Sequence, residues 1–76
     1  MKNSTTSKRL SILISSLKLS QKDFATKTGV DSAIICRILK GETEPNIKSL
    51  EKIANATRIS PSWLMGYGND DEMERI

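Results

Sequence analysis

The chain of 76 residues contains no histidine and a single cysteine. One cysteine cannot form an intramolecular disulfide, and Cys36 without histidine does not supply the ligands of a zinc site. The commonest nucleophile–base pairs in enzymes also require histidine. We therefore expect a protein that is not an enzyme and that carries no metal and no small-molecule cofactor.

Long apolar runs are absent as well. No segment approaches the roughly 20 apolar residues that span a membrane, and residues 1–7 lack the apolar stretch of a secretory signal. The length fits one small domain, and 37% hydrophobic residues can form a modest core. These features predict a cytoplasmic domain without a membrane partner.

The net charge of +3 is unevenly distributed along the chain. Residues 1–40 carry eight basic and two acidic side chains, a net charge of +6, whereas residues 41–76 carry four basic and seven acidic, a net charge of −3. Such an asymmetry favours one face that meets a polyanion and another that is kept away from it.

The spacing of apolar residues predicts an all-α fold of five helices. Three segments carry apolar residues three and four positions apart, a shorter one carries two adjacent apolar residues, and residues suited to helix capping precede all four. The apolar stripes are Leu10, Leu13, Ile14 and Leu17; Phe24 and Ala25; Ile34, Ile35, Ile38 and Leu39; and Ile47, Leu50, Ile53 and Ala54. The expected caps are one of Thr5, Thr6 and Ser7, then Ser20, Asp31, Asn46 and Ser60. A short fifth helix is expected from Pro61 to about Met65, ended by Gly66.

The second and third of these helices have the spacing of a helix-turn-helix. A turn of about three residues separates them, and Gly29 within it can adopt positive φ. Small Ala25 allows a close crossing, while Ile35 and Ile38 fix the third helix on the second. The outward side of the third helix is then free to face DNA.

With these motifs the sequence resembles the Cro/CI-type (XRE-like) helix-turn-helix regulators of phages and bacteria, over about residues 8–68. The resemblance implies a compact five-helix, lambda-repressor-like DNA-binding domain in residues 1–68, followed by an acidic tail, residues 69–76, that we expect to be flexible. The segments that carry it are Leu19-Ser20-Gln21, Thr28-Gly29-Val30, Arg37-Ile38-Leu39-Lys40-Gly41, Glu44-Pro45-Asn46 and Ile59-Ser60-Pro61-Ser62-Trp63-Leu64.

The resemblance implies that the third helix lies in the major groove of double-stranded DNA. By position, Ser32, Ala33 and Arg37 would read bases, with Cys36 at the edge. Arg37 can pair with guanine, and Ala33 can contact only a thymine methyl. The alternatives are a phosphate contact or surface ion pair for Arg37, and a small space-filling role for Cys36.

Phosphate contacts are expected on both sides of this helix. Gln21 lies at the start of the second helix, where free N–H groups can meet an anion. Lys8 and Arg9, ahead of the first helix, and Lys40 and Thr43, after the third helix, could hold the two flanks. For each lysine, a solvated charge is the alternative.

The sequence departs from the family pattern at three places. Ile14 and Leu39 occupy positions where many relatives have a buried Arg–Glu pair, which supports the fold without buried ions. Glu42 and Glu44 lie in a loop that is often basic. The third helix has no Asn or Gln, so it lacks the side chains that read adenine by a bidentate amide.

The C-terminal apolar residues are expected to take part in a weak homodimer. The resemblance implies an interface that includes Trp63, Met65, Tyr67 and Ile59, although Trp63 could instead close the core. Together these features predict a sequence-specific repressor, of the phage or prophage type, that binds a palindromic operator on the nucleoid. The alternative is a protein-interaction module, such as an antitoxin or an anti-repressor partner. The chain could also be the N-terminal part of a longer repressor.

Overall fold

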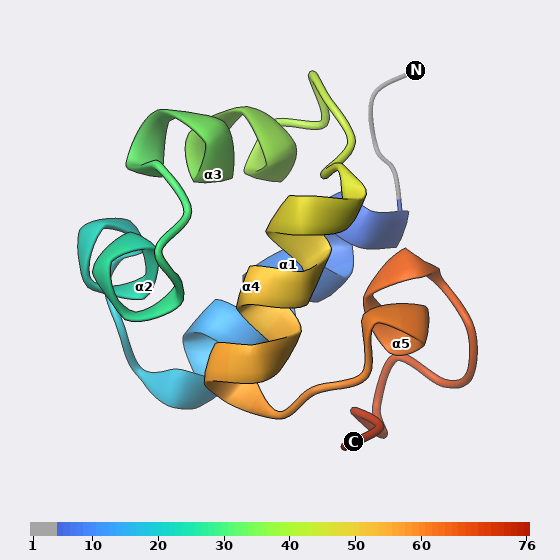
Figure 1. Ribbon diagram of the computed structural model, residues 1–76. Coiled ribbons are helices and arrows are strands. Elements are labelled where there is room, and N and C mark those ends of the chain that lie inside the picture. The colour runs from blue at the N-terminus through green and yellow to red at the C-terminus, as the bar shows by residue number, and fades with distance from the viewer. Residues whose placement is uncertain (1–4) are drawn as a thin grey trace.

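The computed structural model describes residues 5–76, which fold into five helices packed around one core (Figure 1). The all-α prediction is confirmed. The helices are α1 (Thr5–Leu17), α2 (Gln21–Thr28), α3 (Ser32–Leu39), α4 (Ile47–Thr57) and α5 (Pro61–Met65).

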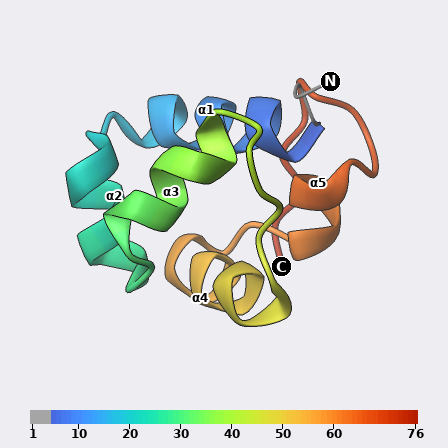
Figure 2. The same ribbon diagram turned by 90° about the horizontal axis from the view of Figure 1, so that it is seen from above.

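Hydrophobic burial holds the helices together, because the predicted stripes point to a shared centre. Phe24, Ile35, Ile38 and Trp63 are fully buried, and Trp63 supplies the largest buried side chain. Figure 2 shows α1 running behind α3, with α4 on one side and α5 beside the start of α1. Two stripe residues differ from an inward position: Ile47 is 74% exposed at the first turn of α4, and Ile34 of α3 is 39% exposed.

Four of the predicted helix caps are present. The side chains of Ser20, Asp31, Asn46 and Ser60 each accept a hydrogen bond from a backbone N–H two or three residues onward, at 2.8–3.2 Å. Each cap satisfies a donor that the first turn would otherwise leave without a partner.

The expected cap of α1 among Thr5, Thr6 and Ser7 is wrong, because all three residues lie within the helix. Thr6 and Ser7 lie within α1 and are buried. The hydroxyl of Ser7 donates to the carbonyl of Leu39 at 2.6 Å, which joins α1 to the end of α3. Residues that lie within the helix do not occupy its N-cap position.

The C-terminal segment, residues 69–76, lies against the domain in this structure. The N–H of Ser60 donates to the carbonyl of Glu74 at 2.7 Å, and the N–H of Ile76 donates to the carbonyl of Arg58 at 3.0 Å. These bonds flank an antiparallel bridge between Ile59 and Arg75. The segment thus returns to the linker between α4 and α5.

Candidate nucleic-acid interface

The turn between α2 and α3 sets the direction of the helix that is expected to read DNA. Gly29 ends α2 with φ +79°, in the left-handed region, and its N–H donates to the carbonyl of Ala25 at 2.8 Å. Asp31 then caps α3. Ala25, Ile35 and Ile38 are buried between the helices, as the spacing predicted. The buried side of α3 is therefore fixed, and its opposite side faces outward.

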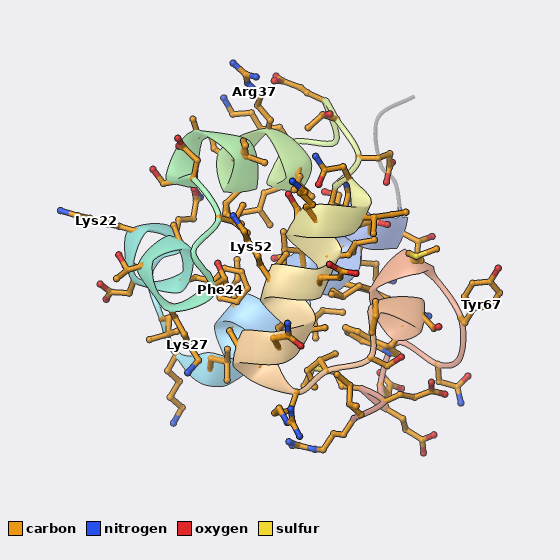
Figure 3. The ribbon with its side chains drawn as sticks, in the orientation of Figure 1. Lys22, Phe24, Lys27, Arg37, Lys52 and Tyr67 are labelled. Carbon is orange, nitrogen blue, oxygen red and sulfur yellow. The ribbon has the colours of Figure 1, made fainter. Side chains whose placement is uncertain are left out.

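The outward side of α3 carries the predicted base-reading residues. Ser32, Ala33 and Arg37 are exposed, and Cys36 is half-buried on the same side. Arg37 points away from the body of the molecule (Figure 3). Within residues 5–76 both ion pairs involve Asp70, so Arg37 is not held by a carboxylate of the described part of the chain.

Two of the predicted phosphate contacts are exposed at the ends of the helix-turn-helix helices. Gln21 is exposed at the first position of α2, and Lys40 is exposed at the end of α3. Lys22, which is not among the residues predicted from the sequence, is also exposed, and Figure 3 shows it extending outward from α2. Its place one residue after Gln21 was the signal that could have found it.

The loop after α3 offers little positive charge. Thr43 is exposed, and its hydroxyl contacts the carbonyl of Glu44 at 3.5 Å. Glu42 and Glu44 are exposed beside it. A phosphate at this loop would meet the Thr43 hydroxyl and backbone N–H groups close to two carboxylates.

Arg9 is not placed to contact phosphate, which corrects its predicted role. Its side chain is 4% exposed, and its guanidinium donates to the carbonyls of Trp63, Tyr67 and Gly68 at 2.6–2.7 Å. Its Nε donates to the Asp70 carboxylate at 2.8 Å. The guanidinium carbon lies 5.0 Å from the centre of the Trp63 ring, within the range of a cation–π contact. All of these groups would have to separate before Arg9 could turn to DNA.

Lys8 lies beside Arg9 and shares its partner. Its Nζ is 2.8 Å from the Asp70 carboxylate, although the lysine side chain remains 65% exposed. Hydrogen bonds from Lys8 and Arg9 lower the pKa of Asp70 below its ordinary value of 3.8. Lys8 is accessible, but in this structure its charge is partly compensated.

Known proteins share the sequence pattern and the fold of this chain. The sequence model of the family described as Helix-turn-helix matches residues 11–64. The chain belongs to the helix-turn-helix family. The crystal structure of the restriction-modification controller protein C.AhdI from Aeromonas hydrophila superposes with a TM-score of 0.72 at 27% identity, over 79% of this chain and 91% of that one.

A second relative agrees at the sequence level. An uncharacterized HTH-type transcriptional regulator from Haemophilus influenzae is 48% identical over 42 residues, which are 55% of this chain and 18% of the relative. The chain therefore corresponds to a small part of that relative's length. The family and both relatives support a DNA-binding domain of the transcription-regulator type. Within residues 5–76, no helix is long and apolar enough to cross a membrane.

Two of the four predicted dimer residues of this helix-turn-helix protein are core residues instead. Trp63 is fully buried and its indole N–H donates to the carbonyl of Asn69 at 2.7 Å, while Ile59 is 2% exposed. Met65 and Tyr67 are 52% and 66% exposed. The structure therefore has the alternative for Trp63, in which its side chain closes the core.

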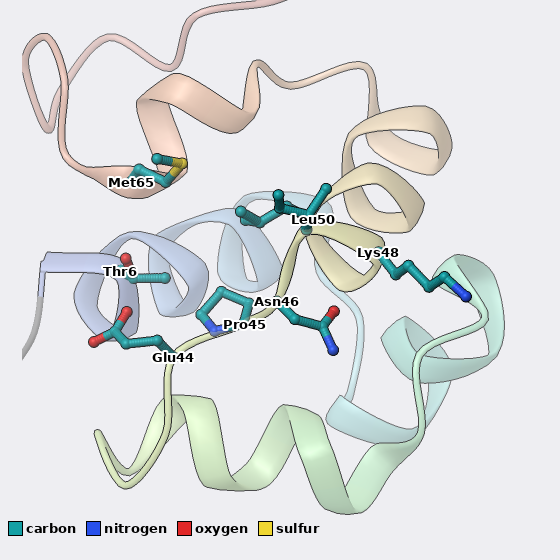
Figure 4. Close-up of a pocket in the computed structure, with 8 residues that line it drawn as sticks. Thr6, Glu44, Pro45, Asn46, Lys48, Leu50 and Met65 are labelled. Atoms are coloured by element: carbon teal, nitrogen blue, oxygen red, sulfur yellow. The ribbon is translucent and has the colours of Figure 1, made fainter.

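A groove lies next to Met65 in the helix-turn-helix protein. It encloses about 800 Å³ between α5, the start of α1 and the first turn of α4 (Figure 4). Met65 and Thr6 approach it from one side, and Pro45 and Leu50 from the other. Ile47 and Met65, both well exposed, give its rim an apolar character.

Proposed function

We propose that this helix-turn-helix protein is a repressor that binds a specific sequence of double-stranded DNA with α3 in the major groove. The observation that carries the proposal is the outward side of α3, where Ser32, Ala33 and Arg37 are exposed without a partner helix over them. Occupation of the operator would block the polymerase sterically, with no chemical step.

Base reading would come chiefly from Arg37. A guanidinium pairs in bidentate geometry with the O6 and N7 atoms of guanine, which discriminates by about 1–3 kcal/mol against other bases. Ser32 can donate to or accept from a base edge, Ala33 can contact a thymine methyl, and Cys36 lies at the edge of this surface. The free direction of Arg37 in Figure 3 supports its role.

Phosphate contacts would position α3 in the groove. We assign them to Gln21 and Lys22 at the start of α2, and to Lys40 and Thr43 after α3. Backbone N–H groups at the N-terminus of α2 add a partial positive charge for the same anion. Lys8 would contribute when it leaves Asp70, whereas Arg9 has no part in this interface.

A homodimer would let two α3 helices read a palindromic site on one face of the duplex. Half-sites one turn of DNA apart, roughly 34 Å, require two subunits related by a twofold axis. Met65 and Tyr67 are the exposed apolar residues from the predicted interface that remain available for it. We place such a repressor on the nucleoid of a bacterial cell or a phage-infected host, and assign it to the phage or prophage type.

A protein-interaction module is the second candidate, because the groove beside Met65 is apolar and open. An antitoxin or an anti-repressor partner would bind another protein there. Co-purification of a stable protein partner, together with failure to select any DNA site, would favour this candidate.

Selection of bound sites from a random pool of duplexes is the deciding experiment. We expect one sequence with two inverted half-sites, and an affinity that falls with salt by a logarithmic slope of about −0.9 for each phosphate neutralised. A pool that shows no enrichment, or an affinity insensitive to salt, would contradict the proposal.

Arg37→Ala then tests base reading on the selected site. We expect a loss of discrimination at one base pair of each half-site, by about ten- to a hundredfold, measured as the affinity ratio of matched and mismatched duplexes. Lys27→Ala is the control, since Figure 3 shows Lys27 on the side of α2 away from α3. Equal weakening of all duplexes by Arg37→Ala would identify Arg37 as a phosphate contact instead.

A further inference from the structure

The outward side of α3 is unusually apolar for a surface that faces a polyanion. Ile34 is 39% exposed, Ala33 is exposed, and Cys36 is half-buried. The other large hydrophobic residues that are exposed within residues 5–76 lie on α4, α5 or the segment after α5. Ile34 is thus the large apolar side chain presented by the reading helix.

An isoleucine in the major groove needs an apolar partner. The polar edges of guanine, cytosine and adenine would lose water against a hydrocarbon without gaining a hydrogen bond, which is unfavourable. Thymine is different because its C5-methyl group projects into the major groove. Contact with that methyl removes apolar surface from water on both molecules.

We propose that Ile34 is a specificity-determining residue that reads the C5-methyl group of a thymine close to the guanine read by Arg37. Ile34 precedes Arg37 by three residues, so the two side chains are neighbours along the helix surface. One helical turn advances about 5.4 Å and one base pair about 3.4 Å, which places the methyl within one or two base pairs of the guanine. The inference rests on the proposed DNA-binding function.

Thymine-to-deoxyuridine replacement tests this inference without changing the protein. Each thymine of the selected operator is replaced in turn in synthetic duplexes, where thymine is the sole source of a C5-methyl group. Deoxyuridine keeps the hydrogen-bonding groups and removes one methyl. We expect about a three- to fivefold loss of affinity at one thymine of each half-site, the amount that one buried carbon contributes.

Protein variants then assign the methyl contact to Ile34. Ile34→Ala is expected to bring the thymine/deoxyuridine affinity ratio close to one at that position, whereas Ile34→Val retains most of it. Ile76→Ala removes an exposed isoleucine from the C-terminal segment and should leave the ratio unchanged. Thermal unfolding of each variant confirms that it is folded at the assay temperature.

Three outcomes separate this inference from the proposed function. Specific binding with no thymine sensitive to deoxyuridine overturns the role of Ile34 and leaves the DNA-binding function intact. A ratio that persists in Ile34→Ala and disappears in Ala33→Gly assigns the methyl contact to Ala33 and also overturns it. Failure to select any site contradicts the proposed function, and the inference falls with it.

Discussion

Arg9 shows how one buried charge can organise the end of a small helical domain. Its guanidinium donates to the carbonyls of Trp63, Tyr67 and Gly68, which lie in α5 and just after its end. The planar group has donors in fixed directions, so it can serve several acceptors at once. A residue that sequence position assigned to DNA therefore holds α5 and the following segment on α1.

Replacement of Arg9 is expected to be costly. In Arg9→Ala, three carbonyls and the Asp70 carboxylate lose a buried donor, and we expect the free energy of unfolding to fall by about 2–4 kcal/mol. Arg9→Lys should recover little of this free energy, because an ammonium group cannot reproduce the planar, forked arrangement of the guanidinium donors. Urea denaturation measures both variants, with Lys8→Ala as the control because Lys8 is largely exposed. An equal loss in Arg9→Ala and Lys8→Ala would contradict this role.

Asp70 links stability to pH in a defined direction. Its pKa is lowered below 3.8 by hydrogen bonds from Lys8 and Arg9, so its stabilising contribution is present above the unfolded-state pKa and is lost as pH falls through the folded-state value. Asp70→Asn should thus be less stable than the parent protein near pH 6, and the difference should shrink toward pH 2. Denaturation at the two pH values measures it. A difference that grows on acidification would contradict the assignment.

At the scale of the elements, local patterns predicted α2, α3 and their turn well. Gly29, the caps Ser20 and Asp31, and the buried Ile35 and Ile38 all follow from short-range rules of helix capping and periodicity. These rules use residues close together in the chain, and the turn itself is a local structure.

The predictions that failed depend on contacts between distant segments. Arg9 and Ser7 have partners that are 32 to 61 residues away, and no local pattern specifies them. Trp63 and Ile59 were predicted to lie in a dimer interface. Apolar residues near the end of a domain can be buried either in its core or in an interface, and the sequence pattern is the same in both cases. Only the packing of α1 against α5 decides between them.

Gly29 carries a prediction about the helix-turn-helix element. Its φ of +79° disfavours residues with a Cβ. An added Cβ would meet no atom within 4 Å. A substitution would therefore lower the stability through backbone strain and not through a steric clash. Gly29→Ala should lower the free energy of unfolding by about 1–2 kcal/mol, and Gly29→Asn by less, because Asn tolerates this region better. Chemical denaturation measures both. A larger loss for Asn than for Ala would indicate a steric cause.

At the scale of the whole molecule, the charge asymmetry of the sequence is not a clean division into two faces. Asp70, from the acidic half, pairs with Lys8 and Arg9 from the basic half. Exposed positive charges of the helix-turn-helix include Arg37, Lys40 and Lys22. The net charge of residues 1–40 therefore overstates the charge available to DNA.

The proposed dimer gives a prediction at the same scale. Met65→Asp together with Tyr67→Asp places two charges on an exposed apolar surface, and we expect the dimer dissociation constant to rise at least about tenfold, since unpaired charges in an interface are unfavourable. Analytical ultracentrifugation measures the association. Ile76→Asp is the control at another exposed apolar residue. An unchanged dimer in the double variant would place the interface elsewhere.

The docked C-terminal segment has a practical consequence for handling the protein. Ile76 is tied to Arg58 by a backbone hydrogen bond, and Figure 1 places the end of the chain on the opposite side of the body from α3. A fluorescent reporter or a surface tether joined after Ile76 would project away from the reading helix. Immobilised in this orientation, the protein would present α3 to duplexes in solution, which suits it to measurement of binding on a chip.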